Sequence, residues 1–448
     1  MSEIPNSWLR TRLGEITDYG KVDRIESRDI PDDAWVLALA DIEKDTSRLL
    51  ERVTFAQRQS KSTKNRFRKG EVLYGKLRPY LNKVLMADDD GFCTTEIVPI
   101  SSSNAIIGRY LFYWLRTPEF LAYVNAVSYG LNMPRLGTKD GLAAPAILAP
   151  ITEQKRIADK LDSLLQKVDT CQEHLERVPQ IIKRFRQSVL AEAVSGRLTE
   201  EWRGENSSGE MEIENFSFPD TWQIQSFDDT LDLIDGDRGK NYPKRTDYQE
   251  SGYCVFLSTK NVRDFGFKFE EVVFISEEKH NILRSGTLER GDVVITTRGT
   301  LGNVAYYDDT VPFDVIRINS GMLILRKKQE NILGKYLVIC IASSFFKTQL
   351  EEKRSGSAQP QIPAKTLKTF LLPLPPVDEQ QEITNRVEKL FTFANQLEER
   401  YQAGKDCVDL FTPSLLAKAF RGELVEQDPT DEPASVLLER IRAARAAG

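Results

Sequence analysis

The sequence predicts an α+β protein in which two mixed α/β domains alternate with two long helices that pack together like a coiled coil. Two observations predict this. A heptad pattern of apolar residues runs over residues 153–198, and the same pattern returns over residues 379–424. The two segments are related by a constant offset of 226 residues, and a long block of mixed composition precedes each. Long helices that follow equivalent blocks indicate an internal repeat.

The apolar stripe of each predicted helix alternates steps of three and four residues, apart from one step of seven between Tyr401 and Val408 in the second. It comprises Ile157, Leu161, Leu164, Val168, Cys171, Leu175, Val178, Ile182, Phe185 and Val189 in the first helix, and Ile383, Val387, Leu390, Ala394, Leu397, Tyr401, Val408, Phe411 and Leu415 in the second. Pro179 lies inside the first helix and should kink it or split it near Val178, because proline lacks an N–H and its ring clashes with the preceding turn.

The repeat extends beyond the helices. Gly130 and Pro134 match Gly356 and Pro360 at the same offset, whereas the paired Pro-x-x-Trp starts, at residues 5–8 and 219–222, are 214 residues apart. The globular blocks have therefore absorbed insertions that the helices have not. We expect a first domain at 1–150, a spacer helix at 151–198, an acidic linker at 199–217, a second domain at 218–376, a second helix at 377–420, and a tail with a short helix at 421–448.

Composition favours a cytoplasmic protein. The chain has 448 residues, a net charge of −6, and no apolar run long enough to span a membrane. Its five cysteines are scattered without a C-x-x-C pair, which is typical of reduced thiols. Only two histidines are present, which disfavours a histidine-rich metal site.

A basic segment at residues 58–83 departs from the acidic balance of the chain. It has nine Lys or Arg residues against one Glu, a net +8, interleaved with Phe67, Tyr74 and Tyr80. A charge run is more often a solvated face, but this one is dense, of one sign and rich in aromatic residues, so attraction to phosphate is the better interpretation. Gly70, Gly75 and Pro79 within it predict strand–turn–strand. Residues 110–127 should then form one amphipathic helix.

Three further loops carry positive charge or turn residues in the second block. They are GDRGKNYPKRTDY at 236–248, the β-rich segment GDVVITTRGTLGNVAYY at 291–307, and KRSGSAQPQIP at 353–363.

Catalytic motifs are missing. The loop at Gly236 lacks the first glycine and the hydroxyl residue of a P-loop. The stretch Glu277-Glu278-Lys279 resembles part of a nuclease site but has no Pro-Asp partner upstream, and no turn suited to S-adenosylmethionine is recognisable. Two heads with positive loops and no catalytic set describe a binding protein with no metal or cofactor of its own.

The chain resembles the specificity subunit of Type I restriction–modification systems over nearly its whole length. The resemblance rests on the paired Pro-x-x-Trp starts, the L-x-P-x-x-E-Q entries at residues 148–154 and 374–380, and the exit F-R-Q-S-V-L-A-x-A-x-x-G-x-L at 185–198. GEVLYGKLRPYLNKV in the first block, GSAQPQI in the second and the final segment at 420–441 add to it.

The resemblance implies two target-recognition domains that each read half of an asymmetric, bipartite DNA site. Two antiparallel helices would fix the separation of the half-sites and give the chain a pseudo-two-fold repeat. Two methyltransferase subunits carrying S-adenosylmethionine, and motor–nuclease subunits attached through them, would complete the complex. Because the exit motifs repeat beyond what the helix seam requires, we expect them to help bind two copies of one partner.

The residues expected to face DNA are the basic and amide side chains of the loops described above. They are Lys64, Arg66, Arg68, Lys76, Arg78 and Asn82 in the first domain, and Arg238, Lys240, Lys244, Arg298, Asn303, Lys353 and Arg354 in the second. Arginine and asparagine are the types that pair with guanine and adenine edges. Two alternatives stay open: a methyltransferase or nuclease with degenerate motifs, and a scaffold whose heads bind proteins instead of DNA.

Overall fold

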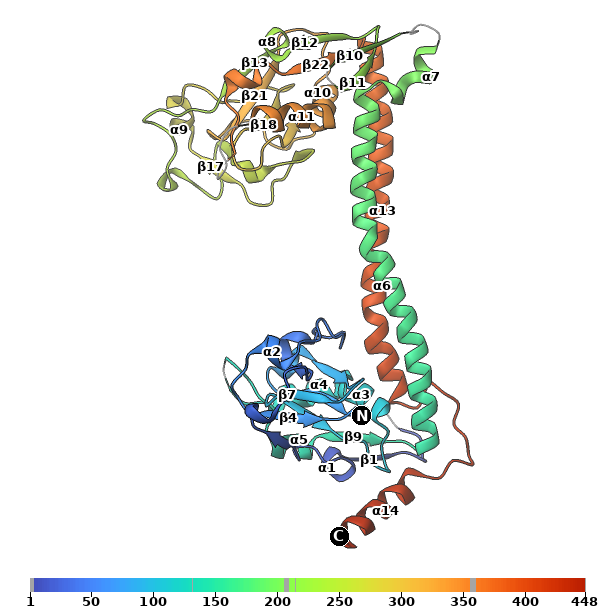
Figure 1. Ribbon diagram of the computed structural model, residues 1–448. Helices are drawn as coiled ribbons and strands as arrows, with labels where there is room; N and C mark the ends of the chain where they lie inside the picture. Colours follow the sequence, from blue (N-terminus) through green and yellow to red (C-terminus); the bar gives the residue numbers. More distant parts are fainter. Residues whose placement is uncertain (1–3, 131, 205–208, 214, 355–359, 448) are drawn as a thin grey trace. The chain divides into compact units, whose positions relative to one another are not determined.

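The computed structural model describes residues 4–130, 132–204, 209–213, 215–354 and 360–447. The chain divides into two compact units, Met1–Glu176 with Gln402–Gly448, and Arg177–Tyr401. Each unit holds one mixed α/β head and part of each long helix (Figure 1). The predicted class, two α/β heads with two long helices, is confirmed. We call the heads head 1 (β1 to β9) and head 2 (β12 to β22).

Head 1 combines two sheets with short helices. Strands β2, β4, β7 and β3 form one sheet in that order, β6, β5 and β8 form the other, and β1 pairs with β9. The strands are β1 Leu9–Arg12, β2 Asp23–Ile25, β3 Val36–Leu37, β4 Lys64–Phe67, β5 Val72–Gly75, β6 Val84–Met86, β7 Gly91–Thr94, β8 Ile97–Ile100 and β9 Pro145–Leu148; the helices are α1 Leu13–Ile16, α2 Phe55–Arg58, α3 Gly108–Leu115, α4 Pro118–Val127 and α5 Thr138–Ala143. Strands β5 and β8 are buried on both faces, as their continuous apolar composition predicts.

Head 2 has the same plan. Strands β13, β21, β18 and β19 form one sheet, β17, β14 and β20 another, and β12 pairs with β22 as β1 pairs with β9. The strands are β12 Gln223–Ser226, β13 Leu231–Asp235, β14 Cys254–Leu257, β15 Val262–Arg263, β16 Gly266–Phe267, β17 Val273–Ile275, β18 Val293–Thr296, β19 Val304–Tyr306, β20 Ile316–Ile318, β21 Met322–Lys327 and β22 Leu371–Leu374; the helices are α8 Phe227–Thr230, α9 Glu277–Ile282, α10 Gly334–Ala342, α11 Ser344–Lys353 and α12 Ala364–Leu367.

One predicted helix is two helices. The segment at 110–127 contains α3 and α4, which meet at Thr117. The Thr117 hydroxyl accepts a hydrogen bond from the N–H of Phe120 (3.2 Å), and Pro118 occupies the first helical position, where its missing N–H does no harm. Ser343 caps α11 in the same way in head 2. The prediction of one continuous helix was wrong because this cap and proline were overlooked.

The segment at 199–217, expected to be an acidic linker, carries structure of its own. It contains helix α7 (Glu200–Arg203) and strand β10 (Glu210–Ile213), which pairs with β11 (Phe216–Pro219); residues 205–208 and 214 lie outside the described residues. The rings of Phe216 and Phe218 pack on Phe345 with centroids 5.0 and 5.1 Å apart. Because the segment is mostly polar, the sequence did not predict that its phenylalanines pack on head 2.

The long helices are α6 (Ile151–Val194) and α13 (Val377–Ala419). Both continue through an internal proline, Pro179 in α6 and Pro413 in α13, so the expected split near Val178 does not occur. Proline removes one backbone hydrogen bond, whereas packing of the stripe on either side of it continues through half-buried Val178 and buried Ile182.

The two helices run antiparallel within each unit. In the second unit Arg186 of α6 donates to Asn395 (2.7 Å) and Glu398 (2.8 Å) of α13, and in the first unit Gln172 donates to Asp409 (3.4 Å). Most of the predicted stripe is buried or half-buried. Cys171 and Phe411 are exposed, however, so the predicted stripe was wrong at these two positions.

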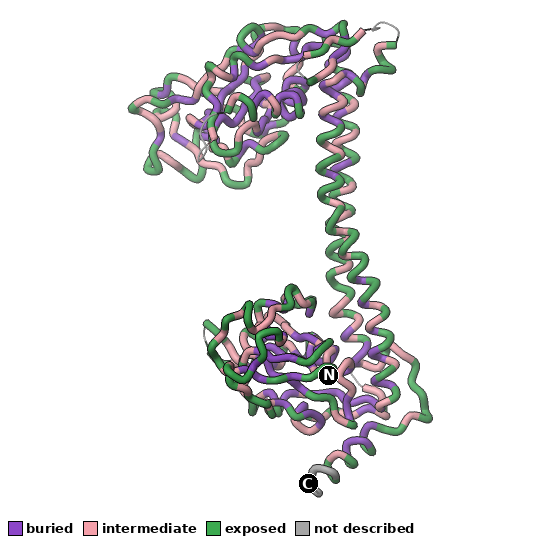
Figure 2. The backbone as a smooth tube through the Cα atoms, in the orientation of Figure 1, coloured by how far each residue is buried: buried purple, intermediate pink, exposed green. Residues whose placement is uncertain are grey.

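The end of each helix packs into the head of the other repeat. Leu190 and Ala193 of α6 belong to the core of head 2, whereas Leu416 and Phe420 belong to the core of head 1. The ring of Phe420 lies 4.9 Å from that of Tyr110. The exit motifs therefore each close a hydrophobic core, and their expected part in binding two copies of a partner stays a prediction. Figure 2 shows the buried residues concentrated in the heads and the helix surfaces largely exposed.

The internal repeat is preserved at the level of single hydrogen bonds. Buried Gln154 accepts from the N–H of Ile107 and donates to the carbonyls of Ala105 and Ala149. Gln380, at an offset of 226, makes the same three bonds with Leu333, Asn331 and Pro375. The L-x-P-x-x-E-Q motifs thus fasten the start of each long helix to the head that precedes it.

The tail completes the first unit. Helix α14 (Ala434–Ala447) follows α13, as predicted; its Leu437 and Leu438 join the core of head 1, and the N–H of Ala434 donates to the carbonyl of Ser7 (2.9 Å). Within the described ranges, no helix has the length and apolar character needed to cross a bilayer.

Candidate nucleic-acid interface

In head 1, two loops that are distant in sequence join side by side. The β5–β6 loop, residues 76–83, contacts the segment made of residues 129, 130 and 132–136: the N–H of Leu136 donates to the carbonyl of Lys76 (2.9 Å), and the N–H of Arg78 donates to that of Pro134 (2.7 Å). Leu77 and Arg135 form a β-bridge between them. We call this pair the head 1 loop pair. It presents Lys76, Arg78 and Asn82, three of the predicted residues, together.

Head 2 contains the equivalent pair. The β18–β19 loop, residues 297–303, contacts the segment that ends at Ile362, whose N–H donates to the carbonyl of Thr297 (3.1 Å). Arg298 and Gln361 form the matching β-bridge. Residues 355–359, which belong to the predicted GSAQPQI motif, lie outside the described residues. The structure thus brings Arg298 to the place that Leu77 holds in head 1.

The two loops share a backbone conformation but not the residues that adopt it easily. Arg78 and Asn82 have φ of 50° and 49°, in the left-handed region, where Gly299 and Gly302 of head 2 have φ of 76° and 80°. Glycine adopts this conformation freely, whereas a side chain there costs roughly 1–2 kcal/mol. The fold accepts glycine at this turn, so head 1 keeps the side chain of Arg78 at an energetic cost. Such strain is characteristic of functional positions.

Each loop is anchored from below by its last residue. Lys83 Nζ donates to the carbonyl of Leu39 (2.7 Å), and Asn303 Nδ2 donates to that of Val262 (2.9 Å). Asn303 is buried. Its side chain therefore holds the loop in place instead of facing solvent, which corrects its assignment as a DNA-facing residue.

The tip of the head 1 loop pair carries large exposed side chains around Arg78. Tyr80, Tyr129 and Met133 are 48%, 62% and 45% exposed. Neighbouring Arg135 is already paired with Glu96, with Nε to Oε2 at 3.2 Å. Sequence reasoning missed Tyr129 and Met133, although they lie beside Gly130 and Pro134, the positions that revealed the repeat.

The basic segment is only partly on the surface. Lys64 on β4 is fully buried, and its ammonium donates to the hydroxyls of Ser60 and Ser62, both at 2.8 Å. Burial, together with the nearby charge of Arg58, lowers the pKa of Lys64. Arg66, on the same strand, and Arg68, just beyond its end, are exposed. Lys64 was wrongly assigned to the interface.

Arg66 has an acidic neighbour. Its Nη1 lies 3.4 Å from Asp23 on the paired strand β2, and its guanidinium lies over the ring of Phe92 at 5.7 Å. A solvent-exposed pair of this kind contributes little to stability and can exchange its partner for a phosphate.

The loop at 236–248 in head 2 is organised by a carboxylate. Buried Asp237 accepts the N–H groups of Gly239 (2.6 Å) and Arg284 (2.7 Å), and these bonds lower its pKa. The N–H of Gly239 is therefore occupied, which agrees with rejecting a phosphate loop here. Lys240 and Lys244 are exposed, whereas Arg238, also exposed, pairs with Asp235 (2.7 Å).

Lys353 is the last residue of α11, and Arg354 follows it. Lys353 is half-buried, with its ammonium 5.1 Å from the ring of Phe370, and exposed Arg354 pairs with Glu351 at 2.9 Å. The heads thus offer guanidinium and ammonium groups on adjoining loops. Among the described residues, no group of three or more His, Cys, Asp or Glu side chains is arranged to hold a metal ion.

The fold and these loops define a two-headed binding protein. Comparison with known proteins shows to which family of binding proteins the chain belongs. Residues 219–403 match the model of the Type I restriction modification DNA specificity domain. The chain is 30% identical over 348 residues to the EcoBI specificity subunit of Escherichia coli, covering 75% of this chain and 72% of that protein, and 29% identical over 364 residues to the EcoDI specificity subunit of the same organism, covering 76% and 78%.

Two solved structures share the fold. The HsdS subunit from Thermoanaerobacter tengcongensis has a TM-score of 0.60, and a chain from a study of complex assembly and conformational transition of the type I R-M system has a TM-score of 0.73. Both are 18% identical and cover 94% of this chain, and 98% and 100% of their own chains respectively. The protein belongs to the family of Type I restriction enzyme specificity subunits, which are non-catalytic.

Proposed function

We propose that this chain selects the DNA sequence on which a Type I restriction–modification enzyme acts, with each head reading one half of an asymmetric, bipartite site. The observation that carries the proposal is the loop pair found in both heads: one backbone framework that presents different side chains. Two diverged readers of this kind favour two different half-sites, unlike the palindromes read by identical subunits.

Within each head we assign different tasks to two sets of exposed residues. Arg78 and Arg298 lie on the loop pairs and have the guanidinium geometry that binds guanine O6 and N7. Arg66, Arg68, Lys240, Lys244 and Arg354 lie on flanking surfaces and suit phosphate contacts, which position the duplex without reading it. Lys76, Asn82, Arg238 and Lys353 stay in the proposed interface, with Asn82 suited to adenine.

The helices are the proposed ruler between half-sites and the docking surface for two methyltransferase subunits. Apolar side chains exposed on the helices support the second role: Ile181 (61%) and Phe393 (51%) in the second unit, and Leu410 (67%) and Phe411 (46%) in the first. S-adenosylmethionine would be bound by those partners, and motor–nuclease subunits would join through them. All five cysteines, each within the described ranges, are unpaired, in keeping with a proposed cytoplasmic location.

A domain exchange tests the proposal. Residues 1–150 are replaced by the corresponding head of a relative, with the positions that contact Leu416, Phe420 and α14 kept as they are here. Methylation-sensitive sequencing of a host expressing the chimera with its methyltransferase should show one changed half-site and one unchanged half-site. A change in both halves would refute independent reading by the two heads.

A further inference from the structure

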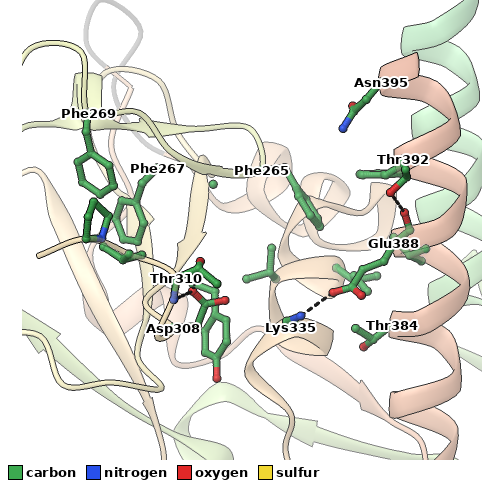
Figure 3. A pocket seen from close by; sticks show the side chains of 18 residues that line it. Phe265, Phe267, Phe269, Asp308, Thr310, Lys335, Thr384, Glu388, Thr392 and Asn395 are labelled. Carbon is green, nitrogen blue, oxygen red and sulfur yellow. Dashed lines mark hydrogen bonds and ion pairs between the residues drawn. The ribbon is translucent and has the colours of Figure 1, made fainter. Parts of the chain in front are cut away.

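The second unit contains a pocket of about 740 Å³ between head 2 and α13. Phe265, Phe267 and Phe269, from the β15–β16 hairpin and the residues after it, lie along one wall (Figure 3). Phe391 of α13 also lines the pocket, with its ring centroid 5.1 Å from that of Phe265. Lys335 of α10 pairs with Glu388 of α13 at 2.7 Å within it. Phe265 is 43% exposed. Aromatic rings left open beside polar groups are typical of an interaction site.

The first unit carries different side chains at the equivalent positions. Arg109 and Asp162, which match Lys335 and Glu388 at the offset of 226, form the same ion pair. The Tyr113 hydroxyl also donates to Asp162. The position equivalent to Tyr113 is Ile339, which lines the pocket and offers no hydroxyl to Glu388.

A guanidinium at the end of α3 in the first unit contacts a ring and a neighbouring loop. Arg116 lies over the ring of Phe112 (4.9 Å) and donates to the carbonyls of Asp45 (3.4 Å) and Thr46 (3.2 Å). This loop follows the 3₁₀ helix Leu39–Asp41, as the β15–β16 hairpin follows the 3₁₀ helix Thr259–Asn261. The position equivalent to Arg116 is Ala342. The second unit therefore lacks both a phenol and a guanidinium at positions where the first unit has them.

We propose that this pocket binds a segment of a partner protein that presents an arginine next to an aromatic side chain. The first unit shows which chemistry fits the framework, because its tyrosine and arginine occupy the same elements. The lining has two acidic side chains, Asp308 and Glu388, and one basic side chain, Lys335. This excess of negative charge favours a positively charged ligand. The phenylalanine rings offer the guanidinium cation–π contacts of the kind that Arg116 makes with Phe112.

The experiment uses the full chain and the probe N-acetyl-Tyr-Arg-amide, with N-acetyl-Tyr-Glu-amide as the charge-reversed control. Saturable binding of the first probe is expected, with a Kd on the order of 1 mM, measured by ligand-observed NMR. The variant Ile339→Tyr with Ala342→Arg introduces the side chains of the first unit at Ile339, which lines the pocket, and at Ala342, three residues further along α10, and should weaken binding at least about tenfold. It should keep the DNA preference of the wild-type chain, so this test is independent of the proposed reading function.

Two further variants keep the test decisive if the variant Ile339→Tyr with Ala342→Arg does not fold. Glu388→Gln removes the carboxylate. It should weaken binding of N-acetyl-Tyr-Arg-amide and leave the weak binding of N-acetyl-Tyr-Glu-amide unchanged. Tyr113→Ile with Arg116→Ala should open an equivalent pocket in the first unit and add a second binding equivalent. Equal binding of the two probes, or full retention of binding in the Glu388→Gln chain, would overturn the proposal.

Discussion

Head 1 and head 2 hold equivalent tryptophans against equivalent buried glutamates, but the second partner of each glutamate differs. Trp8 donates to Glu153 at 2.8 Å, and Trp222 donates to Glu379 at 3.0 Å. The second carboxylate oxygen accepts from the amide of Gln427 in the first unit, whereas in the second it pairs with Arg203. The contacts that hold a helix to its head are thus kept, while charges around them vary. The loop pairs follow the same rule: the two heads share the backbone conformation and differ in the side chains that it presents.

The largest expected difference between the units concerns these glutamates. Glu379→Gln leaves Arg203, itself only 9% exposed, without a counter-charge, and should lower the free energy of unfolding of the second unit by about 3–5 kcal/mol. Glu153→Gln removes only a neutral amide contact, and burial already raises the pKa of Glu153, so we expect about 1–2 kcal/mol. Hydrogen exchange measured region by region in the full chain would compare them. Equal losses would show that the charge difference is unimportant.

Arg78 sharpens the comparison at the loop pairs. Arg78→Gly relieves left-handed strain of about 1–2 kcal/mol but increases the entropy of the unfolded chain by about 0.5–1 kcal/mol, so stability should rise by no more than about 1.5 kcal/mol. Binding to the cognate site, in contrast, should weaken by about 1–3 kcal/mol if the guanidinium reads a base. Arg78→Ala keeps the strain. It should lose the same affinity as Arg78→Gly and be less stable than that variant. Gly299→Ala, which meets open space, is the matched strain control in head 2. Weakening that is equal on all sequences would assign Arg78 to phosphate.

The basic segment allows a smaller test within head 1. Arg66→Ala with Arg68→Ala should reduce the log–log salt slope of DNA binding by about 0.9 for each phosphate that the variant no longer neutralises. Lys64→Ala should leave that slope unchanged and reduce stability, because Lys64 is buried. Titrations of the complete methyltransferase complex between low and moderate salt would separate the two effects. A slope change for Lys64→Ala alone would contradict the structure.

The smallest expected effect distinguishes the heads by pH. His280 Nδ1 accepts from Arg317 Nε (3.1 Å), and burial and the charge of Arg317 lower the pKa of His280. The unfolded chain therefore binds a proton near pH 6.5 that the folded head releases, so the stability of head 2 should fall as the pH drops below about 6.5. His280→Asn, which keeps an acceptor oxygen, should flatten this dependence. Head 1 has no histidine, so its stability should not fall in this way below about pH 6.5. Hydrogen exchange measured region by region at several pH values would compare the two heads.

The pattern of the sequence predicted the long helices, the repeat and the placement of charged loops, because heptads and a constant offset are one-dimensional signals. It failed where contacts between distant residues decide the outcome. Lys64 stands in a basic run but is buried, with its ammonium bonded to the hydroxyls of Ser60 and Ser62, and Asn303 is a loop residue that bonds to the distant carbonyl of Val262. The contact within the head 1 loop pair depends on backbone hydrogen bonds that no composition reveals. Whether the predicted residues contact DNA stays a prediction.

The crossed helix ends affect how the protein emerges from the ribosome. The second unit is contiguous in sequence, but the first unit needs Leu416, Phe420, Leu437 and Leu438 to close its core. Translation proceeds at about 5–20 residues per second, so head 1 waits tens of seconds with an open apolar face after its own strands are made. The head encoded second therefore completes its fold first. Nascent chains of this protein therefore expose the apolar face of head 1 to chaperones until Leu416, Phe420, Leu437 and Leu438 have been synthesised.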